Sequence, residues 1–261
     1  MEDTSIGAEI LEELIVIGSG TGIPSLRRGP PGLIVISDRT RLLIDSGSGT
    51  LGRMLEVGVT YRDPDLLLYT HIHPDHVSDL VPIIFASKYA DQPREKELLC
   101  IGGPGFQSYF EKLKNLYGSW IEPQTYPLTI KEIPPKGLVY RDLRILSRPM
   151  AHISESVGYR MEFRDGKSMA ISGDTDYCQN IIDLASDVDL LILECSFPDG
   201  RKVEGHLTPS LAGRIALESR CKKLLLTHLY PVCDQFDIVN QCRQVYPGEI
   251  ILGEDLMRID I

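Results

Sequence analysis

The stretch that decides the fold is LLLYTHIHPDHV at residues 66–77, in which an apolar run leads directly into three histidines and an aspartate. The apolar run is typical of a buried strand. His71 and His73 are two residues apart, so on an extended chain their side chains lie on the same side. The proline after His73 ends the strand, and Asp75 and His76 then open a helix. The stretch thus offers one imidazole pair and one carboxylate–imidazole pair, enough to begin two adjacent metal sites.

Further candidate ligands follow other apolar runs. His152, His206 and His228 each lie in or beside a turn, where a single histidine is more often a surface or partly buried residue than a ligand. Asp45 and Asp174 close apolar runs, and such an aspartate is often only a turn residue. Considered together with residues 66–77, these histidines and aspartates are better interpreted as metal ligands. Two metals need more than four protein ligands, and carboxylates commonly bridge such ions.

Short apolar runs elsewhere predict strands at 14–17, 33–36, 42–44, 66–69, 98–101, 143–146, 157–163, 168–171, 190–193, 224–226 and 250–252. Helical spacing occurs between them at about 77–89, 105–117, 177–185, 208–219 and 235–245. This alternation predicts an α/β fold. Thr208 before Pro209 predicts an N-cap. The proline-dense segment 121–137 favours an ordered loop or flap, with a plain connector as the alternative.

Composition limits the class of protein. The chain has 261 residues, of which 43% are apolar, and we expect one domain spanning 1–261. No apolar run reaches the roughly 18 residues of a spanning helix, and the acidic start Met1-Glu2-Asp3 is unlike a signal peptide. A net charge of −10 gives no chain-wide footprint for nucleic acid. The cysteines form no CxxC pair, so we expect reduced thiols and a cytoplasmic protein; they are Cys100, Cys178, Cys195, Cys221, Cys233 and Cys242.

The order of these histidines and aspartates resembles the five motifs of the metallo-β-lactamase superfamily, over residues 14–228. The resemblance implies an αββα sandwich, two facing mixed sheets with helices outside, and a site at one sheet edge. It also implies two divalent metal ions, for which these ligands suit Zn first, with Mn or Fe as alternatives. The implied ligands are His71, His73 and His152 for one ion and Asp75, His76 and His228 for the other, with Asp174 bridging the two and Asp45 orienting a ligating histidine.

A second resemblance is narrower. Glu194-Cys-Ser, followed by His206-Leu-Thr, is similar to the ribonuclease Z group, in which a His-Glu-Ala-Thr stretch precedes a His-x-Thr motif. The resemblance implies that His206 protonates the leaving group, that Glu194 orients it, and that Asp75 accepts the nucleophile's proton. The alternative for His206 is a surface residue at a helix start. The opening loop at 20–28 also resembles that of the group.

The chain also departs from that group. Leu193 stands where the group has the first histidine of His-Glu-Ala-Thr, and Arg28-Gly replaces Arg-Asn in the opening loop. Only 22 positions separate His152 from Asp174, which leaves no room for the tRNA-binding arm of typical members. Affinity for tRNA depends largely on cationic contacts to phosphate. One basic run near the site could make such contacts, but a solvated strand face explains it equally well. It comprises Arg141, Arg144 and Arg148.

These features predict a dinuclear metal-dependent phosphodiesterase that resembles ribonuclease Z. Metal-activated hydroxide would attack phosphorus, and the substrate would be a small phosphodiester or an RNA 3′ end. The alternatives are a tRNA 3′-processing endoribonuclease, a lactone, thioester or β-lactam hydrolase on the same fold, and a metal-binding regulatory module without turnover. The family resemblance also implies a homodimer, and no membrane partner is expected.

Overall fold

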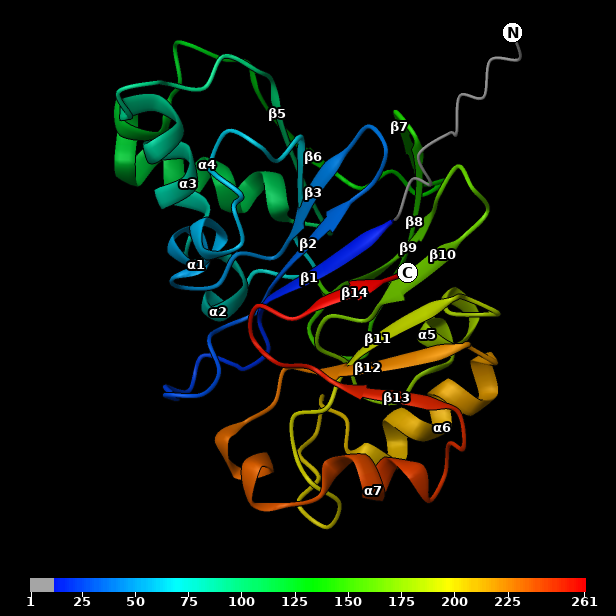
Figure 1. The fold of residues 1–261 in the computed structure, drawn as a ribbon. Coiled ribbons are helices and arrows are strands. Elements are labelled where there is room, and N and C mark those ends of the chain that lie inside the picture. The colour runs from blue at the N-terminus through cyan, green and yellow to red at the C-terminus, as the bar shows by residue number, and fades with distance from the viewer. Residues whose placement is uncertain (1–11) are drawn as a thin grey trace, which may run out of the picture.

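Two β-sheets pack face to face in this computed structural model, which describes residues 12–261 (Figure 1). The acidic start at Met1 lies outside the described residues. The first sheet contains, in spatial order, β14 (Arg258–Asp260), β1 (Glu13–Gly18), β2 (Gly32–Ile36), β3 (Arg41–Ile44), β4 (Leu66–Leu68), β5 (Leu98–Gly102) and β6 (Leu128–Glu132). The second sheet contains β13 (Glu249–Leu252), β12 (Lys223–Thr227), β11 (Leu190–Glu194), β10 (Ser168–Ile171), β9 (Val157–Glu162), β8 (Leu143–Pro149) and β7 (Leu138–Tyr140).

Helices cover the outer face of each sheet. The first sheet carries α1 (Thr50–Glu56), α2 (Pro74–Val77), α3 (Leu80–Tyr89), α4 (Phe106–Tyr117) and the short 3₁₀ helix η1 (Gly118–Ile121). The second carries α5 (Gln179–Leu184), α6 (Pro209–Ser219), α7 (Ile238–Arg243) and the 3₁₀ helix η2 (Pro231–Gln235). Apolar clusters fill the space between the sheets and the space under each helical layer. The expected αββα sandwich is therefore confirmed.

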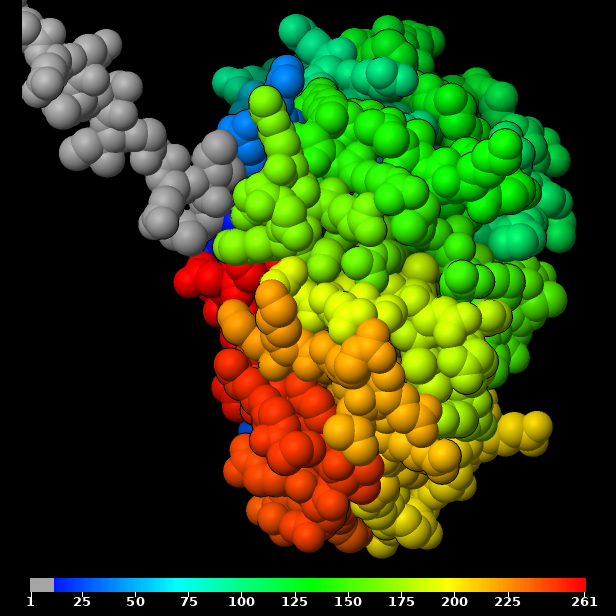
Figure 2. Space-filling view, turned by 90° about the vertical axis from the view of Figure 1, so that its right-hand side faces the viewer, coloured from blue at the N-terminus to red at the C-terminus, as the bar shows by residue number. Residues whose placement is uncertain are grey.

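Each sheet is mixed, and in one half of it the strands are parallel. Strands β3 to β6 are parallel in the first sheet and β10 to β13 in the second, while the remaining pairs are antiparallel. Strands covered on both faces are apolar throughout, and this explains why short continuous apolar runs predicted most of them. Figure 2 shows the molecule from the side, with the middle of the chain above its C-terminal half.

Several elements differ from expectation. The sequence did not predict β6, β7, β14 or α1, and β6 lies inside the proline-dense segment 121–137 that was expected to be a loop. This strand is at the edge of its sheet, where flanking prolines are tolerated. Thr208 is the N-cap of α6, as expected, but its side chain makes no capping hydrogen bond. The Asp199 carboxylate instead accepts from the Ser210 backbone N–H. Within residues 12–261, no helix is both long and apolar enough to cross a membrane.

A buried guanidinium fixes the start of β4, the strand that leads to the histidine stretch. Arg94 is 1% exposed and lies between the loops that precede β4 and β5. It donates hydrogen bonds to five backbone carbonyl oxygens, those of Tyr61, Arg62, Pro64, Lys96 and Glu97. Burial lowers the pKa of Arg94, but an arginine keeps its charge at neutral pH. One side chain therefore satisfies backbone acceptors from two loops.

We expect Arg94→Met to lower the free energy of unfolding by about 3 kcal/mol, because five buried or partly buried carbonyls lose their donor. Urea unfolding followed by circular dichroism measures the change. Arg62→Met is the control, since the Arg62 side chain is exposed and bonds Gln92. Its effect should stay within roughly 0.5 kcal/mol. Equal losses in the two variants would contradict the role given to Arg94.

Candidate metal centre

The ten residues that the sequence predicted to form a site all lie at one edge of the sandwich. Parallel strands place their carboxyl ends at the same edge, and most of these residues follow such an end. Asp45 follows β3, His71 and His73 follow β4, Asp75 and His76 lie in α2, His152 follows β8, Asp174 follows β10, Glu194 ends β11, His206 precedes α6, and His228 follows β12.

One group of ligand atoms combines three histidines with an aspartate. His71, His73, His152 and Asp174 each offer an atom that lies within 4.8 Å of the others. His152 Nε2 is 3.2 Å from His73 Nδ1, and the Nε2 atoms of His71 and His152 are each 3.8 Å from Asp174 Oδ2. The geometry has the donor set and compactness of a divalent metal site.

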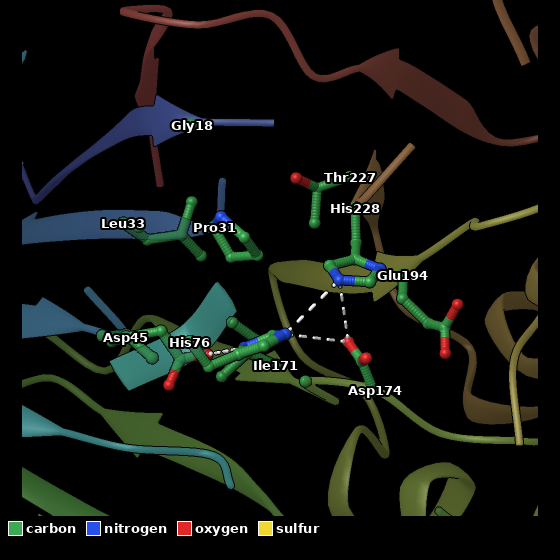
Figure 3. A pocket seen from close by; sticks show the side chains of 13 residues that line it. Gly18, Pro31, Leu33, Asp45, His76, Ile171, Asp174, Glu194, Thr227 and His228 are labelled. Atoms are coloured by element: carbon green, nitrogen blue, oxygen red, sulfur yellow. Dashed lines mark hydrogen bonds and ion pairs between the residues drawn. The ribbon is translucent and has the colours of Figure 1, made fainter. Parts of the chain in front are cut away.

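A second group shares Asp174. His76 Nε2 and His228 Nε2 are 3.3 Å apart, and each is 3.4 Å from Asp174 Oδ1 (Figure 3). Asp75 Oδ2 lies 3.5 Å from His228 Nε2 and 3.9 Å from His76 Nε2. Asp174 thus turns one oxygen to each group, the arrangement that a carboxylate bridging two cations requires.

The ring protons of four histidines are already committed to protein oxygens. His76 donates from Nδ1 to Asp45 Oδ2 over 2.8 Å, and the Nδ1 atoms of His71, His152 and His228 lie 3.0–3.1 Å from an oxygen. Those oxygens belong to the Thr70 side chain, the Gly205 backbone and the Ser196 side chain. A neutral imidazole carries one N–H, so each of these rings directs a lone pair from Nε2 into the cluster.

These lone pairs favour a positive charge between them. The Nε2 atoms of His76 and His228 lie 3.3 Å apart. Burial lowers the pKa of His76, but the carboxylates of Asp174 and Asp45 outweigh it and raise the pKa above its ordinary value, so the cluster attracts positive charge, as a proton on His76 or as a cation. His71 Nε2 and Asp174 Oδ1 are buried without a hydrogen-bond partner among residues 12–261. Burial and the neighbouring His76 imidazole lower the pKa of His71, which keeps it neutral. The residues therefore fit divalent metal ions.

Glu194 and His206 form a pair beside the metal ligands. Glu194 is 2% exposed and accepts from His206 Nδ1 over 3.0 Å. It also accepts from the Thr175 backbone N–H and from the Ser196 hydroxyl. Burial lowers the pKa of His206, but the Glu194 hydrogen bond and charge outweigh it, so the pKa lies above its ordinary value. The pair thus favours the protonated form of the His206 imidazole near the cluster.

Sequence reasoning missed the residues that hold these side chains. Ser196 contacts Glu194, His206 and His228 at once, and Thr70 connects Asp45 to His71. Thr70 lies within residues 66–77 and Ser196 is two residues from Glu194. This closeness to predicted site residues was the one feature of the sequence that could have indicated them. The Gly22 backbone N–H also donates to Asp75 Oδ2 over 3.0 Å, which brings the opening loop against the cluster.

Two site residues have strained backbones. Asp45 has φ 56° and His228 has φ 54°, in the left-handed region that side chains other than glycine seldom adopt. The hydrogen bonds of Asp45 to Thr70 and His76 hold the first residue in place, and Ser196 holds the second. Strain of this kind persists where the surroundings over-determine a conformation, as they do at functional sites.

The basic run that was expected near the site extends along β8 away from it, with only Arg148 toward the site, and its first two arginines are paired. Arg141 pairs with Asp65, and Arg144 pairs with Glu162. Between His152 and Asp174 the chain forms only β9, a tight turn and β10, so this stretch holds no inserted arm.

The αββα layers and the ligand cluster define a metal-dependent hydrolase. Residues 40–229 match the family described as a beta-lactamase superfamily domain, and the chain belongs to that superfamily. Ribonuclease Z of Haloferax volcanii is 24% identical over 94% of this chain and 93% of its own length. The metallo-beta-lactamase fold protein YhfI of Bacillus subtilis is 24% identical with a TM-score of 0.84, covering 96% of this chain and 100% of that one. Human short-form tRNase Z is 20% identical with a TM-score of 0.75, and the match covers 95% of this chain and 99% of that one. The predicted resemblance to ribonuclease Z is confirmed.

We expect Asp45→Ala to weaken divalent metal binding about 10- to 100-fold, because His76 loses the acceptor that fixes its Nδ1–H. Competition against a chelator, with metal content read by mass spectrometry, measures the affinity. Asp142→Ala is a matched control, since the Asp142 carboxylate also accepts three hydrogen bonds but lies away from the cluster. The same loss of affinity in both variants would mean that Asp45 acts through general stability.

Proposed function

We propose that this protein is a phosphodiesterase with two divalent cations, which cleaves small phosphodiesters or RNA 3′ ends. The observation that carries the proposal is the Glu194–His206 pair beside the metal ligands. An alkoxide leaving from phosphorus is a poor leaving group and benefits from a positioned proton donor. Hydrolysis of a lactone, thioester or β-lactam does not require such a pair, so the superfamily fold alone supports those reactions.

The distances support a division of the ligands between two ions. We assign His71, His73 and His152 to one cation and Asp75, His76 and His228 to the other, with Asp174 bridging. Imidazole-rich sites with carboxylates suit Zn²⁺, and Mn²⁺ and Fe²⁺ fit the same ligands. Asp45 orients His76 through the Nδ1–H hydrogen bond.

Two bound cations would lower the pKa of bound water to about 7 and neutralise charge on the phosphate. Glu194 holds the Nδ1 proton of His206, so the proton on Nε2 is the one available to the leaving oxygen. We assign to Asp75 the role of accepting the proton that the nucleophilic water loses. Its carboxylate is held by the Gly22 N–H, and although burial raises its pKa, His228 and His76 bring the pKa below its ordinary value.

Cleavage of tRNA 3′ ends is the second candidate, and the similarity to ribonuclease Z and tRNase Z favours it. Against it are the net charge of −10, the paired arginines and the short connection from β9 to β10. A precursor tRNA with a 3′ trailer distinguishes the two, after reconstitution with Zn²⁺ or Mn²⁺. Cleavage next to the mature 3′ end would favour the nuclease, and hydrolysis of bis(p-nitrophenyl) phosphate alone would favour the small-substrate enzyme.

We expect His206→Ala to slow hydrolysis of alkyl phosphodiesters by about 10²- to 10⁴-fold, because the leaving alkoxide loses its proton donor. Bis(p-nitrophenyl) phosphate should be much less affected, since p-nitrophenolate leaves without a proton. Steady-state kcat/KM values on both substrates measure the difference. Equal losses on both would rule out His206 as the proton donor, and unchanged metal content would show that the cluster is intact.

A further inference from the structure

An open groove of about 380 Å³ lies on the outer side of the second sheet, bordered by α5, by β8 and β9, and by the turn before β7. Its charged side chains are three cations and one carboxylate, in a chain whose net charge is −10. They are Lys136, Arg148, Arg160 and Asp183. The lining therefore carries an excess of two positive charges, opposite in sign to the whole protein. We call it the basic groove.

The guanidinium of Arg160 is fixed by the fold. Its Nε donates to Glu162 over 3.0 Å, and its Nη1 donates to the backbone carbonyls of Leu184 and Ser186 over 3.2 and 2.7 Å. The side chain is 19% exposed, and no atom of residues 12–261 accepts a hydrogen bond from its Nη2. A cation held by three acceptors has little side-chain freedom left to lose when it binds an anion, so this part of the groove is preorganised.

Lys136 and Arg148 carry charges that no protein carboxylate neutralises. Both side chains are exposed, and neither has an ion-pair partner within the part of the chain that the structure describes. Arg144, four residues earlier on β8, is different, because it pairs with Glu162 over 2.8 Å. The two unpaired cations on the basic groove are therefore available to a ligand.

This arrangement suits a phosphate group. Guanidinium groups bind phosphate oxygens through paired N–H donors, and an ammonium group adds a point charge. A phosphomonoester carries about −1.5 to −2 charges at pH 7 and offers three acceptor oxygens. It therefore matches the excess of two positive charges better than a phosphodiester, which has a single negative charge.

We propose that the basic groove is a second anion site, which binds a phosphomonoester dianion outside the metal centre. None of the residues that line it belongs to the metal-ligand groups, so the site does not depend on the proposed function. Hydrolysis of a phosphodiester releases a phosphomonoester, which makes the product of the proposed reaction one ligand of this class. The groove lies on elements that flank two proposed metal ligands, since β8 precedes His152 and α5 follows Asp174.

The test is titration calorimetry of the metal-loaded protein with ribose 5-phosphate. Because the proposed metal centre would also bind phosphate, we expect two classes of site in the unaltered protein. The double variant Lys136→Gln/Arg148→Gln should weaken one class by about 10-fold or more and leave the other unchanged, because two charge-assisted contacts are lost. Arg144→Gln removes a cation from the same strand and should change neither class. The Nε–H resonance of Arg160 should shift during the titration of the unaltered protein.

Identical binding of ribose 5-phosphate by the unaltered protein and the double variant would overturn the proposal. An equal weakening in Arg144→Gln would also overturn it, because net charge rather than the groove would then set the affinity. So would an Arg160 Nε–H resonance that stays in place at saturation. Dimethyl phosphate is a monoanion and succinate is a dicarboxylate, and we expect neither to compete with ribose 5-phosphate for the groove. Competition by either at equal concentration would contradict the phosphomonoester class.

Discussion

The rest of the site depends on which nitrogen of each imidazole ring carries the proton. Two imidazole nitrogens 3.3 Å apart, such as those of His76 and His228, need a proton or a cation between their lone pairs. The Nδ1 atoms of four histidines are hydrogen-bonded to oxygens of Asp45, Thr70, Ser196 and the Gly205 carbonyl. These bonds fix the direction of each Nε2 lone pair before any ion binds. Those oxygens sit on short loops at strand ends, and the buried strands hold the loops in place.

The second requirement is a proton near the leaving oxygen. Glu194 ends β11, and four donors converge on its carboxylate, so its orientation is fixed by the same backbone that carries the metal ligands. Ser196 joins the two systems, since its hydroxyl contacts both His206 and His228. The proposed acid and the proposed metal ligands are thus parts of one hydrogen-bond network, in which displacement of one group is felt by the others.

The sequence predicted most of the fold, and the ten residues that it singled out for a site lie together at one edge of the sandwich. Histidine is rare in this chain, and His71 and His228 closely follow apolar runs, so their positions were informative. Strand β14 was missed because Ile259 is its one buried residue and its partner β1 lies at the other end of the chain. The roles of Thr70 and Ser196 depend on contacts across the fold, and hydroxyl residues are too common for spacing to single them out.

The site residues divide equally between the layers of the sandwich. Five belong to segments that follow strands of the first sheet and five to segments of the second, and Asp174 lies within 4 Å of ligands from both. An ion bound to both sets would therefore be a cross-link between two halves of the chain. Its binding free energy would add to the attraction between the apolar faces of the sheets. The concentration of that ion would then set the free energy of unfolding as well as the rate of the reaction.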